Sequence, residues 1–169
     1  MARPVAKRLS IPGLVLASAT CLLAADPPAK PMHGHAAPVQ GAQVEAPEEC
    51  TYCGMNRTRF ARSRMLVEYA DGSQVGTCSI HCTAIELKKT RGNAPKALRV
   101  GDHGDPAHPL IDARTAFWVI GGSERGVMTP LPKWAFARKA VAEAFIQKSG
   151  GVLASYEEAL AAATQELKK

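Results

Sequence analysis

Two closely spaced pairs of cysteines constrain this 169-residue chain more than any other feature. The first pair is Cys50 and Cys53, in the run CTYCGM, and the second is Cys78 and Cys82, in the run CSIHC. Two thiols separated by two residues can reach one metal ion from a single tight turn, and the glycine that follows them lets the backbone fold around that ion. Four soft ligands in this order predict a metal-binding cluster.

The segments between the two pairs predict how the pairs meet. Alternating apolar residues predict a β-hairpin over residues 65–78, with its turn at Asp71-Gly72. A helix that begins after the capping residue Ser79 and ends before Gly92 places Cys82 in its first turn, where free N–H groups and the helix dipole lower the pKa of a thiol. A turn with two thiols, a hairpin and two thiols at a helix start resemble a treble-clef metal site. Two local disulfides, or inert buried thiols, are the alternative.

Three further residues are candidate ligands. Met55 follows the first pair directly, and its thioether suits Cu(I) better than zinc, although it could instead be a core side chain. His81 lies within the second pair and is either a ligand or a solvent-facing residue. Met128 lies beside prolines in an irregular segment and either projects its thioether or packs. His103 and His108 fall in a polar loop, where we expect both to be solvated.

The pattern β-β-α-β occurs twice, over residues 63–100 and 115–153, and predicts an α+β domain in which two small units share one core. In the second unit we expect an irregular strand over residues 127–136 and a helix over residues 139–148. Ser155-x-x-Glu158 is a capping box that opens a final helix. The predicted inward face of the 139–148 helix consists of Val141, Ala144 and Phe145.

The N-terminal part is typical of an exported protein. Residues 1–25 have a basic start, an apolar run and no acidic residue, which predicts a signal peptide rather than a buried helix. Residues 26–48 form a linker rich in proline and alanine. His33 and His35 within it are expected to lie in a solvated tether rather than a weak metal-catching tract. Residues 49–169 form the predicted metal-binding domain.

Composition and motifs exclude several classes of function. The net charge is +6, and it falls to +3 if the first 25 residues are removed, because these contain three cations and no acid. Without an RNA-binding motif or a dense basic stripe, this charge does not indicate a nucleic-acid-binding protein. The chain has no Ser/His/Asp set, phosphate loop or paired carboxylates, so we do not expect an enzyme.

Several runs together resemble the NosL family of nitrous oxide reductase accessory lipoproteins: CTYCGM, FARSRMLVEYADG, GTCSIHCTAIEL, AFWVIGG and GVMTPLPKWAF. The resemblance covers most of residues 49–155 and implies the paired β-β-α-β fold. It also implies a Cu(I) site that uses Cys53 and Met55, with Met128 as an added ligand, and a periplasmic copper chaperone for nitrous oxide reductase. The sequence departs from the family pattern in its second pair of thiols and its degraded lipobox.

Three functions from different classes follow. The first is an exported Cu(I) metallochaperone whose partner is a periplasmic client, namely nitrous oxide reductase or its maturation machinery. The second is a structural-zinc module that contacts another protein. The third is a thiol–disulfide redox protein, which is the least favoured because Cys50-x-x-Cys53 does not follow a strand at a helix start.

We predict that the mature protein starts after a residue in the range 19–25 and lies in the periplasm, with membrane contact only through a lipid on Cys21. The segment Ser18-Ala19-Thr20 before Cys21 matches a lipobox poorly. If Cys21 carries a lipid, Cys21→Ala should release the protein from membranes in a fractionation experiment. Intact residues 1–169 in the cytosol would contradict export, and unchanged membrane association of the variant would exclude this anchor.

Overall fold

The computed structural model describes residues 45, 47–90 and 92–168. The predicted signal peptide, Cys21, His33 and His35 lie outside these residues, so the statements about them stay predictions. Among the described residues, no helix combines the length and the apolar character that a membrane span requires.

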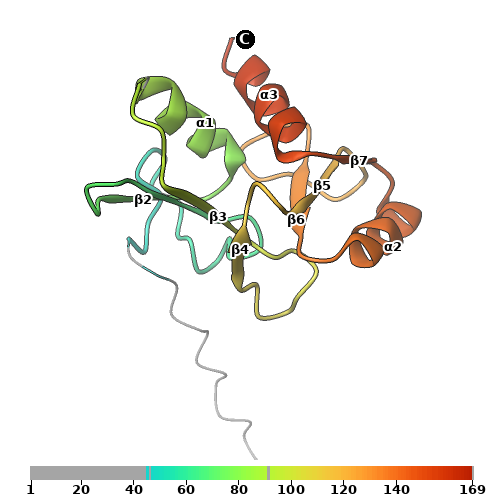
Figure 1. Cartoon of the computed structure of the whole chain (residues 1–169). Coiled ribbons are helices and arrows are strands. Elements are labelled where there is room, and N and C mark those ends of the chain that lie inside the picture. The colour runs from blue at the N-terminus through green and yellow to red at the C-terminus, as the bar shows by residue number, and fades with distance from the viewer. Residues whose placement is uncertain (1–44, 46, 91, 169) are drawn as a thin grey trace, which may run out of the picture. The chain divides into compact units, whose positions relative to one another are not determined.

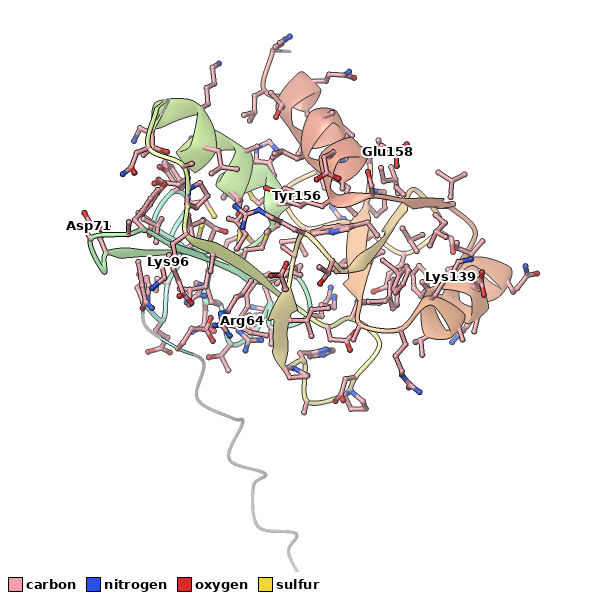
Figure 2. The ribbon with its side chains drawn as sticks, viewed as in Figure 1. Arg64, Asp71, Lys96, Lys139, Tyr156 and Glu158 are labelled. Carbon is pink, nitrogen blue, oxygen red and sulfur yellow. The ribbon has the colours of Figure 1, made fainter. Side chains whose placement is uncertain are left out.

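The first half of the domain is a four-stranded antiparallel sheet with one helix (Figure 1). Its elements are β1 (Met65–Glu68), β2 (Gln74–Thr77), α1 (Ile80–Lys89), β3 (Ala97–Gly101) and β4 (Leu110–Asp112). The strand order is β2-β1-β3-β4, so β1 pairs with both β2 and β3. Asp71 stands at the tip of the β1–β2 hairpin (Figure 2), where its carboxylate accepts a hydrogen bond from the Ser73 N–H at 2.9 Å. The predicted turn is confirmed, and β4 is an element that the pattern did not predict.

The second half repeats this arrangement with a three-stranded antiparallel sheet. Its elements are β5 (Phe117–Ile120), β6 (Lys133–Phe136), α2 (Lys139–Ser149), β7 (Val152–Ala154) and the final helix α3 (Tyr156–Glu166). The strand order is β6-β5-β7. The predicted capping box is present, since Ser155 Oγ accepts from the Glu158 N–H and the Glu158 carboxylate accepts from the Ser155 N–H. The predicted α+β class with two β-β-α-β units is confirmed.

The two units share their apolar cores. One core cluster joins Met65 and Val67 of β1 to Trp118 of β5 and to the buried face of α3. Helices α1 and α3 lie side by side, as Figure 1 shows. Tyr156, at the start of α3 (Figure 2), packs near Trp118 with 6.3 Å between the ring centroids. The expectation of one shared interior is therefore confirmed, because neither sheet covers its own apolar face.

Two details of the second unit differ from the prediction. Only Lys133–Phe136 of the predicted 127–136 strand is a strand, because the segment before it turns at Met128, whose φ is +59°, and contains two prolines that cannot donate to a ladder. On α2 the fully buried residue is Ala142, while Ala144 is exposed and Val141 and Phe145 are half-buried. Val141 and Phe145 pack against the core as predicted, together with Ala142 and Ile146, so Ala144 is the one residue of the predicted inward face that is wrong.

Candidate metal centre

The first pair of cysteines lies on a narrow turn, residues 50–55, which we call the cysteine loop. The Cys50 N–H donates to the Met55 carbonyl and the Gly54 N–H donates to the Cys50 carbonyl, both at 2.9 Å. Gly54 has a φ of +68°, a conformation that only glycine adopts without strain. Glu49 and Asn56 pair as an antiparallel bridge at the base of the turn. These bonds hold both thiols of the first pair on one short loop.

The cysteine loop is attached to the strand that leads to the second pair. The Thr51 N–H and the Thr51 hydroxyl both donate to the Gly76 carbonyl at 3.0 Å. Gly76 lies in β2, two residues before Cys78. The predicted meeting of the two pairs therefore follows from a bond between the loop and the return strand of the hairpin.

The second pair spans the junction between β2 and α1. The Cys78 carbonyl accepts a hydrogen bond from Ser63 Oγ at 2.9 Å, and Cys82 lies in the first turn of α1. Ser79 occupies the capping position as predicted, but its side chain makes no capping hydrogen bond. The helix start is therefore held by packing and by the backbone rather than by a hydroxyl cap.

Four sulfur atoms converge at this place, and we call Cys50, Cys53, Cys78 and Cys82 the sulfur cluster. All four Sγ atoms lie within 4.8 Å of one another. Cys53 Sγ is 3.5 Å from Cys78 Sγ and 3.8 Å from Cys82 Sγ, and the last two are 3.8 Å apart. Thiolates bound tetrahedrally at about 2.3 Å from an ion lie about 3.8 Å from one another. The spacing therefore fits one metal ion.

The same distances bear on the alternative of local disulfides. The shortest of these separations joins Cys53 to Cys78, which belong to different pairs, and all four cysteines of the cluster are free thiols in the structure. An arrangement of two local disulfides would instead bring each pair together within itself. The geometry favours one shared centre.

The burial of the four sulfurs is unequal. Cys50, Cys78 and Cys82 are 3%, 0% and 1% exposed, whereas Cys53 is exposed. The three buried thiols belong to an apolar cluster that includes Trp134 of β6. The centre is thus closed on the protein side and open at one sulfur.

The thiols influence one another's ionisation. The pKa of Cys50 is held far below its ordinary value because the thiols of Cys78 and Cys82 donate hydrogen bonds to its thiolate. The pKa values of Cys78 and Cys82 are raised, first because the hydrogen bond to Cys50 favours their protonated forms, and also because both are buried. At Cys82 these effects outweigh the lowering expected at a helix start. A cation that displaces the remaining protons would allow the other thiols to ionise.

The candidate thioether of Met55 lies beside the cluster. Met55 is half-buried and packs against the apolar cluster that contains the three buried thiols. Its backbone carbonyl closes the cysteine loop. The residue is therefore close to Cys53 along the chain and packs against the apolar cluster to which the buried thiols belong.

His81 and Met128 lie together at a different place. Both line a cavity of about 480 Å³ next to α3. His81 Nδ1 is 3.8 Å from Glu166 Oε2, and this buried nitrogen has no hydrogen-bond partner among the described residues. The Glu166 carboxylate also accepts from Lys133 Nζ at 3.0 Å. The structure thus brings these two candidates to the lining of one cavity, and the converging ligand atoms of the four cysteines do not include a His81 nitrogen.

The expectation that His103 and His108 are solvated is wrong. The His103 ring stacks on Trp134 with 4.5 Å between the centroids, and its Nε2 lies 3.2 Å from Glu124 Oε2. Burial lowers its pKa. His108 Nδ1 is hydrogen-bonded to the Asp102 carbonyl at 2.9 Å. No local pattern revealed the His103 contact, because its stacking partner Trp134 lies on β6, in another part of the chain.

We predict that the cluster acts as one site. Replacing Cys78 and Cys82 together by Ser removes two of the four sulfurs and should weaken metal retention substantially, because oxygen is a poor ligand for soft ions. Dialysis against a chelator without oxygen, followed by metal analysis, measures the loss, and circular dichroism checks that the variant is folded. Retention equal to that of the parent would favour a smaller site at Cys53 and Met55.

Comparison with known proteins agrees with this geometry. No curated protein matches the chain. The crystal structure of the copper chaperone NosL from Shewanella denitrificans is similar, with a TM-score of 0.54 and 26% identity, over 72% of this chain and 96% of that chain. A sequence model of the NosL family matches residues 41–163. The chain belongs to the NosL family.

Proposed function

We propose that this protein is an exported carrier, not an enzyme, that binds Cu(I) in the sulfur cluster and delivers it to a copper protein outside the cytoplasm. The observation that carries the proposal is the convergence of four thiols, three buried and one exposed. Thiolates are ligands for soft ions, of which Cu(I) and zinc are the common ones in proteins. Copper is the cargo in this proposal rather than a resident cofactor.

The exposed sulfur supports a carrier over a closed structural site. A structural metal site is closed by its four ligands, whereas a carrier must admit a ligand from its partner. Cys53 is the exposed sulfur of the four and lies on the cysteine loop. A sulfur ligand of a partner can approach the ion from this side and replace Cys53, while the buried thiols hold the ion until the exchange is complete.

Met55 supports Cu(I) over zinc. Zinc gains little from a thioether, whereas Cu(I) accepts one readily. Met55 is two residues from Cys53 and packs against the apolar cluster that contains the buried thiols. The similar structure is that of a copper chaperone, which points in the same direction.

A structural-zinc module that contacts another protein is the second candidate. The sulfur separations of 3.5 to 3.8 Å are close to those of a tetrahedral site with four thiolates, which is the commonest structural-zinc arrangement of cysteines. A thiol–disulfide redox function has less support. Cys53 is the accessible thiol that a redox pair would need, but its Sγ lies 3.5 Å from Cys78 Sγ, within a four-sulfur cluster rather than in an isolated Cys50–Cys53 pair.

His81 and Met128 have a transient role in the proposal. They line one cavity together with Glu166 and offer an imidazole, a thioether and a carboxylate to an ion that enters or leaves. We propose that they bind the ion briefly rather than store it.

The proposed client rests on the family resemblance, and the proposed cellular location rests on the first 25 residues. Family membership supports nitrous oxide reductase, or its maturation machinery, as the client. The predicted signal peptide places the protein in the periplasm, and a lipid on Cys21 would hold it at the membrane. We do not propose nucleic acid as a partner.

We predict that the protein, purified without oxygen and loaded with one equivalent of Cu(I), transfers the ion to copper-free nitrous oxide reductase. Copper in the separated reductase is the measurement, and Cu(I) supplied on a small thiol is the control for unassisted loading. Faster loading from the protein supports the carrier. Stoichiometric zinc in the isolated protein, together with no advantage over the small thiol, would favour the zinc module.

We also predict that Met55→Ile lowers Cu(I) affinity about tenfold or more, on the order of 1.4 kcal/mol, because it removes a sulfur and keeps an apolar side chain. Zinc affinity and thermal stability should change little. A competition titration against a Cu(I) chelator measures the affinity.

Met65→Ile is the matched control for this experiment. The Met65 thioether is fully buried in β1 and accepts a hydrogen bond from Thr83 Oγ1 at 3.3 Å. This variant should lose stability and keep its Cu(I) affinity. Equal Cu(I) affinity in the parent and in Met55→Ile would reduce Met55 to a packing residue.

A further inference from the structure

A buried carboxylate on α1, which is not part of the sulfur cluster, links the two segments that carry the cysteine pairs. Glu86 lies on α1, one turn after Cys82, and is 6% exposed. Its Oε2 accepts a short hydrogen bond from the Tyr52 hydroxyl, and its Oε1 accepts from the Tyr69 hydroxyl at 2.6 Å. The carboxylate is therefore bound by two phenols that come from two different elements.

The two phenols occupy different places relative to the cysteines. Tyr52 lies on the cysteine loop, between Cys50 and Cys53. Tyr69 follows β1 and is buried in the sheet, where it also pairs with Thr90 Oγ1 at 3.1 Å. Tyr69 thus attaches Glu86 to the sheet, and Tyr52 attaches the cysteine loop to Glu86.

A second contact from α1 holds the ring of Tyr52. The Lys89 ammonium lies 4.9 Å from the centre of the Tyr52 ring and adds a cation–π contact from the same helix. Tyr52 is therefore held to α1 through both its hydroxyl and its ring.

The Tyr52–Glu86 contact lies beside Cys53, the sulfur ligand that must move when the ion is released. Cys53 is exposed and lies one residue after Tyr52, while Cys78 and Cys82 are buried at the start of α1. Apart from the sulfurs, Tyr52 and Glu86 provide a direct side-chain bond between the cysteine loop and the helix that carries Cys82. Movement of Cys53 away from an ion requires the loop to move relative to this helix.

We propose that Tyr52 and Glu86 form a latch that positions Cys53 on the ion and sets the rate at which the cluster releases its cargo. Both are positioning residues, because they act through Cys53 and do not bind the ion. The inference rests on the proposed carrier function. A partner that docks at the exposed Cys53 and displaces Tyr52 from Glu86 would speed release, whereas the undisturbed latch retains the ion.

The test compares two substitutions of the same kind. Tyr52→Phe and Tyr69→Phe each remove one hydrogen bond to the same carboxylate, but only Tyr52 belongs to the cysteine loop. The full-length protein is loaded with Cu(I) without oxygen, and transfer to an excess of chelator is followed by stopped flow. We expect release about ten times faster from Tyr52→Phe, and release within about twofold of the parent from Tyr69→Phe, although Tyr69→Phe also loses the bond to Thr90 and should lose at least as much thermal stability.

Glu86→Gln provides a second route to the same answer. It weakens the acceptor while keeping the shape of the side chain, so it should also speed release. Combined with Tyr52→Phe, it should add little, because both changes break the same contact. Independent, additive effects of the two changes would overturn the latch.

The same release rates can be measured with Co(II), whose thiolate absorption reports the four sulfurs directly. This measurement tests the latch independently of whether copper is the cargo. If the protein does not retain Cu(I) but Tyr52→Phe still releases Co(II) faster than Tyr69→Phe does, the latch stands and the copper function fails. Equal release from the two variants with both ions would overturn the latch, whatever the cargo is.

Discussion

Neither β-β-α-β unit has enough apolar surface to form a core alone, and the structure depends on the pairing of the two. A small sheet with one helix leaves an apolar face that must be covered by another layer. One core cluster joins β1 to β5 and α3, and the other joins the three buried thiols to Trp134 and Phe136 of β6. The metal centre belongs to the first unit by sequence, but the second unit supplies part of the wall behind it. Binding of an ion is therefore linked to the folding of both units.

The closed side of the centre is supported by a buried cation. Arg57 is 0% exposed and lies two residues after the cysteine loop. Its guanidinium donates to the backbone carbonyls of Thr77 and Met65, at 3.2 and 3.0 Å, and pairs with Glu45. A buried charge is tolerated only when its donors are satisfied, and here the carbonyl partners come from adjacent strands. Arg57 thus holds β1, β2 and the segment at Glu45 in one arrangement. The exposed Cys53 is left as the part of the sulfur cluster that can move.

Most of the fold could be predicted because its signals are local. The hairpin turn at Asp71, the alternation in β1 and the capping box at Ser155 each depend on a few neighbouring residues, and all three are present. The errors arose where long-range packing decided the outcome. The start of β6 depends on the turn at Met128, and the buried stripe of α2 depends on which residues face the shared core. His103 is polar in a polar loop, yet Trp134 provides an aromatic face that no local pattern reveals.

The sequence by itself determined which residues could bind a soft ion: two pairs of thiols with short spacing, two thioethers and an imidazole. Ligand type and short spacing are local properties, so they can be recognised before the fold is known. The tertiary structure alone decided which candidates meet. It brought together thiols that are 25 and 29 residues apart, and it placed His81 and Met128 on the lining of one cavity. It also decided that Cys53 is the accessible sulfur, because exposure depends on how the loop, α1 and the second unit pack against one another.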